Sequence, residues 1–600
     1  NGAFICIDME QYEYKEIVLE TFSKVLMEED FRDWTDIGIA MQAYLRETPG
    51  DIEKLIEWVG RRGAPVTVRL VRGAYWDYET IVARQHGWEI PVWTAKAETD
   101  RCYEQCLQDL FSAYPRVRLA VATHNVRSIA CAMVLAGDRG LRTDQFEFQM
   151  LYGMGAGLQH AIATKNYCLR VYVPFGEPIS GMAYLVRRLL ENSTGQAQLL
   201  GKLSGIQPSA NQPLVFGPKR AGSASTGRQS PTVLYPGKHD SASVFVNEPF
   251  RRFIIPRERL EFRAAIEQAR TRMGRLYATH IDRVSLDRPT FINSVNPANP
   301  SEIVGRVRVA AKEHVDQAVR NAREAFSGWS SFPVTRRVEI MRRAASILRN
   351  KRDHFAALEV LEAGKSWYEA DANVTEAIDF LEFYSQEALS LTPPEQMNVP
   401  GEENLCAYIP LGAGVVIAPW NFPLAILAGM VSATLVSGNT VILKPSSETP
   451  IIAAEFVDLL YESGVPRSVL QLLPGPGSSI GRLLAEHRNI HFVTFTGSVE
   501  IGASLVETVS RKRPGQDHVK RITAEMGGKN AIILDSDADP DEALRGVINS
   551  AFGYQGQKCS ACSRLIIVGN QYRPFIERLV YAAKSLKIGL PEDPSVQIGP

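Results

Sequence analysis

The chain has 600 residues, with 66 Lys and Arg against 67 Asp and Glu and a formal net charge of −1. Hydrophobic residues make up 45% and charged residues 22%, which is ordinary for globular proteins and enough for large cores. This balance argues against a broadly basic nucleic-acid coat and against an acidic disordered tail. Eight scattered cysteines exclude a disulfide scaffold and favour a reducing, cytoplasmic setting.

Residues 1–200 alternate short apolar runs with amphipathic stretches such as 51–62. Strands that alternate with helices predict a parallel sheet, either a barrel or a doubly wound sheet. Because the chain opens with Asn1 directly before a strand-like run, we expect it to be an internal fragment. The predicted strands are 4–8, 66–72, 118–123, 146–151 and 169–174.

Polar residues stand at the ends of these predicted strands. Asp8, Arg72 and His124 each lie where a strand ends, and strand carboxyl ends form the site of a parallel barrel. Further along, Arg187 and Arg188 are adjacent, and paired guanidinium groups suit a small carboxylate. Two alternatives stay open: the arginine pair as a solvated helix face, and His124 as a hydrogen-bonded core histidine.

This part of the chain resembles the proline dehydrogenase family over nearly all of residues 1–195. The resemblance implies an incomplete (β/α)8 barrel that binds FAD, with Arg69 stabilising the reduced flavin. It implies that Arg187 and Arg188 grip the carboxylate of L-proline, while Tyr172 and Leu151 pack on its ring. The matching strings are IDME at 7–10, MQAY at 41–44, VRLVRGAYW at 68–76, ATHN at 122–125, FEFQ at 146–149 and YLVRRLLEN at 184–192. The residues implied to line the flavin are Asp8, Gln42, Arg69, Arg72, Gly73, Ala74, Trp76, Thr123 and His124.

The character of the chain changes after residue 200. Residues 201–260 are rich in Gly, Ser, Pro and Gln, which predicts an interdomain linker. Apolar residues then recur at helical spacing in 314–326 and 336–350.

Residues 404–443 carry no charge, so a membrane span has to be considered. Pro419 and Pro423 interrupt this run, which instead predicts a buried strand 414–418, a helix 424–437 and a strand 441–443.

Three residues of the second half suit covalent aldehyde chemistry. Cys559 follows Lys558, and a thiol beside a cation can act as a nucleophile. Glu525 could activate water if burial raised its pKa, and Asn421 could donate to an oxyanion. The alternatives are a structural cysteine, a redox or zinc CxxC with Cys562, an exposed turn glutamate and a helix-capping asparagine.

Glycine-rich turns follow two predicted strands. Gly477 and Gly481 come after the apolar run 469–473, and Gly497-Ser498 after 491–495. Backbone N–H groups at strand-to-helix turns can meet a phosphate, although most such glycines mark ordinary turns. Lys444, which ends a buried strand, could reach ribose hydroxyls.

These pieces resemble the aldehyde dehydrogenase superfamily in order and spacing, from about residue 293 to 600. Segment 553–564 resembles most the branch that oxidises glutamate γ-semialdehyde. The resemblance implies that Cys559 attacks the aldehyde, that Asn421 holds the oxyanion and that Glu525 helps water to release the product. The matching strings are PWNFP at 419–423, LKP at 443–445, FTGS at 495–498, EMGGK at 525–529 and GQKC at 556–559.

The same resemblance implies an NAD site. Lys444 would bind the adenosine ribose, and Ser447 stands where the family often has Glu, which leaves NADP open. Gly497 and Ser498 would lie under the pyrophosphate, and Gly477 and Gly481 are also expected to bind the cofactor.

We therefore expect an α/β chain of four regions: a flavin barrel at 1–200, a linker at 201–260, a Rossmann NAD-binding domain at 261–530 and the start of a catalytic domain at 531–600. The expected function is bifunctional proline catabolism with FAD and NAD, no metal, and channelling of the intermediate.

The expected partners are a membrane quinone, met at the inner face of a bacterial membrane, and further copies of the chain; DNA is not indicated. Alternatives are a different cyclic amine, a parent protein that also represses transcription, and a stretch that is inactive by itself.

Overall fold

The computed structural model describes residues 3–173, 245–277, 281, 290–392, 395–396 and 398–600. The chain divides into two compact units, Asn1–Ala242 and Ser243–Pro600.

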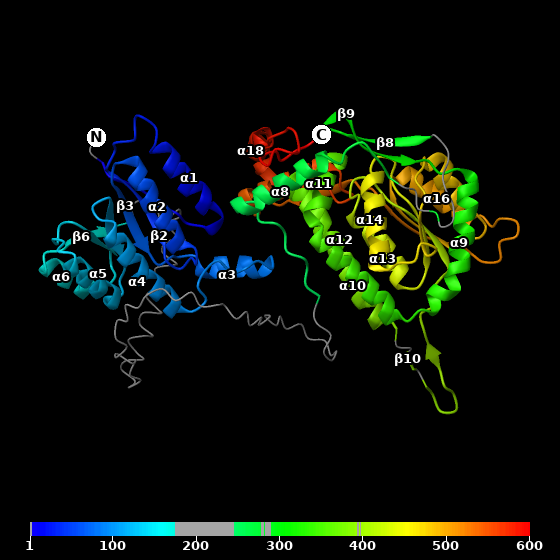
Figure 1. The fold of residues 1–600 in the computed structure, drawn as a ribbon, viewed down its shortest axis with the longest axis horizontal. Coiled ribbons are helices and arrows are strands. Elements are labelled where there is room, and N and C mark those ends of the chain that lie inside the picture. Colours follow the sequence, from blue (N-terminus) through cyan, green and yellow to red (C-terminus); the bar gives the residue numbers. More distant parts are fainter. Residues whose placement is uncertain (1–2, 174–244, 278–280, 282–289, 393–394, 397) are drawn as a thin grey trace. The chain divides into compact units, whose positions relative to one another are not determined.

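The first unit is built on a six-stranded sheet in the order β1-β2-β3-β4-β5-β6 (Figure 1). Each strand lies parallel to the one before it in the chain. A doubly wound sheet reverses its order at a switch point, whereas a barrel adds its strands in sequence. The unit is therefore an arc of a (β/α) barrel, as expected. Its strands are β1 (Ile5–Ile7), β2 (Ile37–Gln42), β3 (Val66–Val71), β4 (Val117–Ala122), β5 (Glu147–Leu151) and β6 (Cys168–Tyr172).

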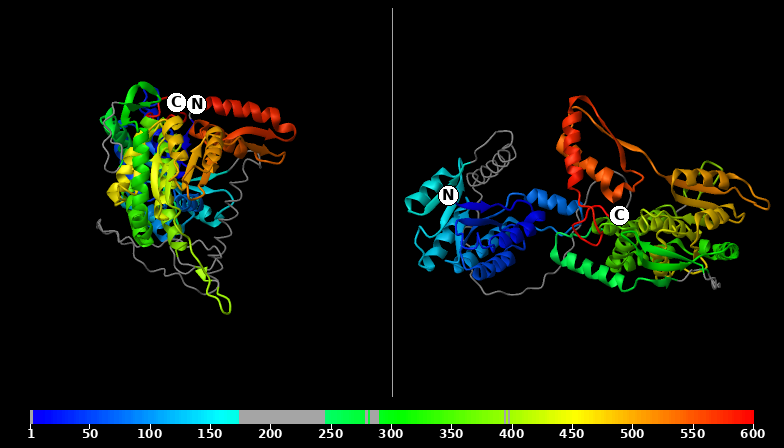
Figure 2. Two further views of the ribbon diagram at one scale, coloured as in Figure 1. Left: turned by 90° about the vertical axis from the view of Figure 1, so that its right-hand side faces the viewer. Right: turned by 90° about the horizontal axis from the view of Figure 1, so that it is seen from above.

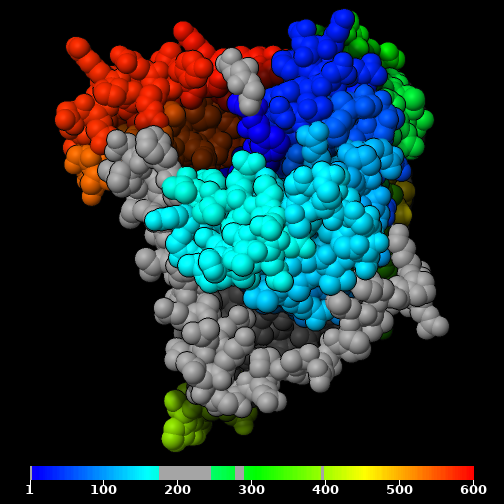
Figure 3. All heavy atoms as spheres, turned by 90° about the vertical axis from the view of Figure 1, so that its left-hand side faces the viewer, coloured from blue at the N-terminus to red at the C-terminus, as the bar shows by residue number. Residues whose placement is uncertain are grey.

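Amphipathic helices connect these strands and complete one close-packed body, coloured blue to cyan in Figure 3. Helix α2 (Thr48–Arg62) buries Leu55, Trp58 and Val59, the face predicted from the sequence. It has a proline in its first turn and ends at Gly63, whose φ of 86° suits glycine. The other helices are α1 (Lys15–Val25), α3 (Trp76–Gln85), α4 (Lys96–Ser112), α5 (Val126–Asp138) and α6 (Ala156–Thr164).

The five predicted strands are present, but β2 was not predicted. Its sequence IGIAMQ is buried throughout and contains Gly38, a poor strand former. A Cβ at Gly38 would lie 2.7 Å from the backbone oxygen of Thr67 on β3. The glycine that weakens the sequence signal is therefore required by the close approach of the neighbouring strand.

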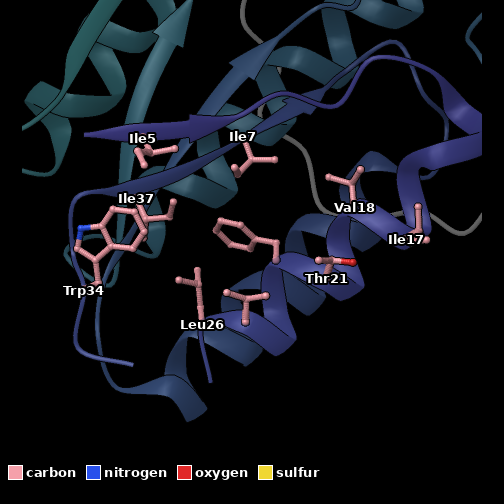
Figure 4. Close-up of a pocket in the computed structure, with 10 residues that line it drawn as sticks. Ile5, Ile7, Ile17, Val18, Thr21, Leu26, Trp34 and Ile37 are labelled. Atoms are coloured by element: carbon pink, nitrogen blue, oxygen red, sulfur yellow. The ribbon is translucent and has the colours of Figure 1, made fainter. Parts of the chain in front are cut away.

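An apolar cavity of about 360 Å³ lies between α1 and the first two strands (Figure 4). Ile7, Phe22 and Trp34 are among its lining, and Thr21 is its polar member. None of the described residues that line it is titratable.

The second unit contains a five-stranded parallel sheet in the order β14-β13-β12-β15-β16. The chain moves outward from β12 to β14 and then returns to place β15 on the other side of β12. This reversal is the switch point of a doubly wound Rossmann sheet. The strands are β12 (Ala413–Ile417), β13 (Thr440–Lys444), β14 (Leu470–Leu472), β15 (Phe492–Gly497) and β16 (Arg521–Met526).

Helices cover both faces of this sheet. Along β12, Val416 packs into one core, and Val415 and Ile417 pack into the other, as the two-residue period of a strand requires. The first core includes α10 (Val334–Asn350), α11 (Arg352–Ala363), α12 (Trp367–Ser390), α13 (Ala425–Val436) and α14 (Pro450–Ser463), and the second α9 (Lys312–Ser331), α15 (Arg482–Glu486) and α16 (Val499–Ser510).

The uncharged run 404–443 contains β12, α13 and the start of β13, which confirms the predicted buried strand–helix–strand unit. Within the described ranges, no helix combines the length and apolarity needed to cross a membrane.

Smaller elements complete the second unit. In the predicted linker, only residues 245–260 are described; Phe253 there packs 5.2 Å from Phe262 and 5.5 Å from Trp367, ring to ring. Figure 2 shows α17 and α18, in orange and red, beside a parallel pair of strands. The remaining elements are α8 (Pro256–Arg270), the sheet of β7 (Arg275–Tyr277), β9 (Asn299–Arg308) and β8 (Phe291–Asn296), the hairpin of β10 (Glu395–Gln396) and β11 (Leu405–Cys406), β17 (Asn530–Leu534), α17 (Pro540–Phe552), β18 (Cys562–Ile567) and α18 (Tyr572–Ser585).

Candidate active sites

Polar side chains gather at the carboxyl ends of the strands in the first unit. Asp8 follows β1, Gln42 ends β2, Arg72 follows β3 and Thr123 follows β4. The buried Gln42 donates from Nε2 to the backbone oxygen of Met9 at 2.7 Å, which ties the ends of β1 and β2 together. Parallel strands that add in sequence bring these ends to one rim, where barrel sites form.

Asp8 and Arg69 lie together at this rim. Arg69 donates a hydrogen bond from Nη2 to Oδ1 of Asp8. The Nε atom of Arg69 is buried and has no hydrogen-bond partner within the described part of the chain. A buried donor without an acceptor is costly, so this atom suits an acceptor on a bound ligand.

Arg72 is held by three neighbours that fix it at the rim. Nη1 donates to Oγ1 of Thr123, Nη2 to Oγ of Ser128 at 2.7 Å, and Nε to Oδ1 of Asp100 at 2.8 Å. Burial favours a raised pKa for Asp100, but hydrogen bonds from Lys96 and Arg72 outweigh it and lower this pKa. Asp100 and Ser128 were not predicted, because both lie on helices without a local motif.

Three residues that were predicted to face the ligands lie next to one another. The backbone N–H of Leu151 donates to Nε2 of His124 at 3.1 Å, so this nitrogen acts as an acceptor. Leu151 is also the register partner of the exposed Tyr172 on β6. The predicted carboxylate ligands Arg187 and Arg188 lie outside the described residues.

The predicted flavin residues after β3 form a tight loop. Gly73 has a φ of 122°, and a Cβ there would lie 2.4 Å from the ring of Tyr44, so only glycine fits. Ala74 is exposed in the same loop. Trp76 begins α3 and donates from Nε1 to the backbone oxygen of Trp93 at 2.8 Å.

In the second unit, the loops of Asn421 and Cys559 are in contact. Asn421 lies between β12 and α13, and its Nδ2 donates to the backbone oxygen of Gln557 at 2.7 Å. Cys559 is exposed, and its backbone oxygen accepts from Nδ2 of Asn530 at 2.7 Å. An amide donor thus meets the loop of an accessible thiol, although 136 residues separate Asn421 from Gln557.

Glu525 lies on strand β16 and is exposed, so the expected burial of this carboxylate is wrong, and the residue does not lie in a turn. Its backbone pairs in register with Thr496 on β15, and its carboxylate makes no hydrogen bond within the described ranges. The connection after β16 comes close to the cysteine loop, because a Cβ at Gly528 would lie 2.9 Å from the backbone oxygen of Cys559. The carboxylate is therefore open to water.

A buried lysine lies at the end of β13. Lys444 is 6% exposed, and burial lowers its pKa to about 8. Its side chain runs beside Gly481, where an added Cβ would lie 4.0 Å from Cδ of Lys444. In the described part of the chain its ammonium has no hydrogen-bond or ion-pair partner, so it suits a hydroxyl-bearing ligand.

The glycine turns differ in the space around them, since an added Cβ at Gly497 would lie 2.6 Å from the ring of Phe495. A Cβ at Gly477 would meet nothing within 4 Å, and Ser447 donates to the backbone oxygen of Gly475 at 3.5 Å. Gly497 ends β15, and Oγ of Ser498 accepts from the N–H of Ile501 at 3.3 Å as the cap of α16. Because the hydroxyl is used in capping, an anion here would meet backbone N–H groups.

The CxxC pair divides between two elements. Cys559 lies in the loop, while Cys562 begins β18 and donates from Sγ to the backbone oxygen of Arg564 at 3.3 Å. Among the described residues, no group of three or more His, Cys, Asp or Glu side chains could hold a metal ion.

Comparisons with known proteins divide the chain in the same way. Residues 284–600 match the aldehyde dehydrogenase family, and residues 1–199 match the proline dehydrogenase family. The 1-pyrroline-5-carboxylate dehydrogenase of Geobacillus thermodenitrificans is 45% identical over 359 residues, which are 59% of this chain and 69% of the relative.

Solved structures give the same result. A crystal structure of proline utilization A from Bdellovibrio bacteriovorus, inactivated by N-propargylglycine, matches with a TM-score of 0.89 and 40% identity. The match covers all of this chain and 62% of that protein, so this chain spans less than two thirds of it. A 1-pyrroline-5-carboxylate dehydrogenase from Thermus with bound NAD matches with a TM-score of 0.58 and 42% identity, over 60% of this chain and 70% of that one.

Proposed function

Because the chain belongs to the aldehyde dehydrogenase family and carries a proline dehydrogenase domain ahead of that part, we propose that it serves two successive oxidations. The first unit oxidises L-proline to pyrroline-5-carboxylate, and the second oxidises glutamate γ-semialdehyde to glutamate. The observation that carries this proposal is the Asn421 amide, held against Gln557 two residues before the exposed Cys559. We propose the division into a barrel at 1–200, a linker at 201–260, an NAD-binding domain at 261–530 and the start of a catalytic domain at 531–600.

The cofactors supply the redox chemistry: when bound, FAD takes the hydride from proline, and NAD takes the hydride from the aldehyde carbon. Within the described residues, neither Nε of Arg69 nor the ammonium of Lys444 has a partner, which supports these two sites. The residues proposed to hold FAD are Asp8, Gln42, Arg69, Arg72, Gly73, Ala74, Trp76, Thr123 and His124, and those for NAD are Lys444, Ser447, Gly477, Gly481, Gly497 and Ser498.

In the first unit the protein binds and orients the substrate. Arg187 and Arg188 hold the proline carboxylate, which suits paired guanidinium groups. Leu151 and Tyr172, which are register partners, pack on the ring. Water then opens the product imine to glutamate γ-semialdehyde.

In the second unit Sγ of Cys559 attacks the aldehyde carbon and forms a thiohemiacetal. The Asn421 amide and the backbone N–H of Cys559 stabilise its oxyanion. Loss of hydride leaves a thioester on Cys559. Glu525, exposed on β16, takes a proton from the water that attacks this thioester, which releases glutamate and restores the thiol.

We further propose the surroundings in which the chain works. It lies in the cytoplasm, passes electrons from the flavin to a membrane quinone through peripheral contact, and assembles with further copies of itself. Both activities in one protein would shelter a reactive intermediate.

The test follows the flavin absorbance of the intact protein after anaerobic addition of proline, and then NADH after addition of a quinone analogue and NAD. We expect bleaching followed by NADH. Bleaching with pipecolate or hydroxyproline but not with proline would point to another cyclic amine.

Two cysteine variants separate the roles in this assay. Cys559→Ala should reduce NADH formation by at least about a thousandfold and spare flavin bleaching, because it removes only the nucleophile. Cys562→Ala is the matched control and should keep NADH formation within about twofold. An equal loss in both variants would favour a dithiol over a single nucleophile.

A further inference from the structure

We propose that Lys365 is a positioning residue, which holds the loop of Asn421 and the loop of Cys559 in fixed relation. The inference rests on the proposed function, since its kinetic test uses semialdehyde oxidation. Lys365 lies in the turn between α11 and α12, and no sequence motif marks it.

Lys365 is fully buried, at 0% exposure. It lies between two helix ends: Gly364 ends α11 with a φ of 65°, and Ser366 caps α12. The turn is therefore defined on both sides, and the lysine side chain starts from a rigid point.

From this turn the ammonium contacts both catalytic loops. Nζ donates to Oε1 of Gln557 at 3.3 Å, and it lies 4.9 Å from the ring centroid of Tyr554 and 6.0 Å from that of Phe422. The rings of Phe422 and Tyr554 stack at 4.8 Å. Phe422 belongs to the Asn421 loop, and Tyr554 and Gln557 belong to the Cys559 loop, so one cation bridges the two.

The backbone before Cys559 is one that needs such support. Tyr554, Gln555 and Gly556 have φ values of 53°, 55° and 68°, all in the left-handed region. Non-glycine residues pay of order 1 kcal/mol or more each for this conformation, which persists only where neighbours enforce it. Glu369, in the first turn of α12, accepts from the backbone N–H of Tyr554, while the Tyr554 hydroxyl donates to the backbone oxygen of Glu369 at 3.2 Å.

Burying the charged side chains of Lys365 and Glu359 costs free energy of folding. Burial lowers the pKa of Lys365, and it raises that of the fully buried Glu359. Neither carboxylate oxygen of Glu359 has a hydrogen-bond partner in the described part of the chain. A core built only for stability would place apolar side chains here, so the cluster suggests a task beyond packing.

The kinetic test compares Lys365→Met with a matched control, Lys520→Met, in the intact protein. Lys520 is also buried, and its Nζ donates at 2.8 Å to the backbone oxygen of Ala485, which lies on α15. We expect Lys365→Met to lower kcat at least about tenfold at unchanged NAD affinity, and Lys520→Met to leave kcat within about twofold.

A double-mutant cycle with Asn421→Ala separates positioning from plain destabilisation. If Lys365 acts through the contact between the two loops, Lys365→Met should cost less than about twofold once the Asn421 amide is gone. An equal loss in both backgrounds, or a loss under about twofold in the parent, overturns the inference. If Lys365→Met does not fold, Gln557→Leu, which removes the acceptor, is put through the same cycle.

Hydrogen exchange by mass spectrometry gives a readout that needs no substrate. Exchange in residues 553–559 should rise severalfold in Lys365→Met and stay unchanged in Lys520→Met. Unchanged exchange in Lys365→Met overturns the inference, whether or not the parent oxidises the semialdehyde. If exchange rises in Lys365→Met but the parent protein forms no NADH, the proposed function alone is overturned.

Discussion

At the scale of single residues, Lys444 couples the proposed NAD site to pH. Burial lowers its pKa to about 8, against roughly 10.4 in an unfolded chain. Between these values the unfolded chain holds a proton that the folded chain has lost, so the free energy of unfolding rises as pH increases through this window. Below about pH 8 Lys444 is protonated in both the folded and the unfolded chain, and the folded chain bears the full cost of burying the charge.

We therefore expect Lys444→Met to raise the free energy of unfolding at pH 7 by on the order of 1–3 kcal/mol and to flatten its rise between about pH 8 and pH 10. Denaturant titrations of parent and variant at several pH values measure this difference. Lys520, whose pKa is also about 8, is present in both the parent and the variant, so its contribution to the pH dependence cancels in the difference. A steeper pH dependence in the variant would contradict the assignment.

At the scale of elements, helix α5 begins where the rim of the first unit is formed. Oδ1 of Asn125 accepts from the N–H groups of Arg127 at 3.0 Å and Ser128 at 3.2 Å, which satisfies two free donors of the first turn. Ser128 in turn accepts from Arg72. The cap therefore also supports the guanidinium at the proposed flavin site.

Asn125→Ala should lower the free energy of unfolding of the first unit by about 1 kcal/mol. Asn125→Asp keeps an acceptor in the same place and should retain most of the stability. Urea titrations followed by tryptophan fluorescence distinguish the two. If the aspartate variant loses as much as the alanine variant, the side-chain cap is not the cause.

The sequence predicted elements well where local pattern decides. The covered strand–helix–strand unit was found because β12 and β13 are apolar on both faces and proline breaks the run between β12 and α13. Strand β2 was not predicted, because Gly38 weakens its strand signal, and glycine is needed there because the backbone oxygen of Thr67 lies so close. The sheet of β7, β8 and β9 also escaped, since its pairing joins segments that carry no regular alternation.

The same limit applied to the sites. Residues at strand ends, such as Asp8 and Arg72, could be named because topology alone collects strand ends at one rim. The contact of Lys365 with Gln557 spans 192 residues, and only the folded chain brings the two together. No pattern around Lys365 distinguishes it from a solvated lysine.

At the scale of the whole molecule, the two proposed sites lie in separate units. Arg72→Met removes three hydrogen bonds of the first unit and should weaken flavin binding at least about tenfold. The ratio of flavin to protein absorbance of the purified variant checks this. NADH formation from added semialdehyde should stay within about twofold of the parent. This is the opposite pattern to Cys559→Ala, which should lose NADH formation and keep flavin bleaching. Loss of both activities in Arg72→Met would show that the second site depends on the first.

The order of strands also has a consequence for synthesis on the ribosome. In the first unit, each strand pairs with one that has already emerged, so the sheet can grow strand by strand. In the second unit, Gly414 on β12 cannot pair with Phe492 on β15 until the residues between them have been synthesised. At ~5–20 residues per second this wait lasts on the order of 4–16 seconds. During this interval one edge of a wholly apolar strand has no partner, and a nascent-chain chaperone would have most to protect there.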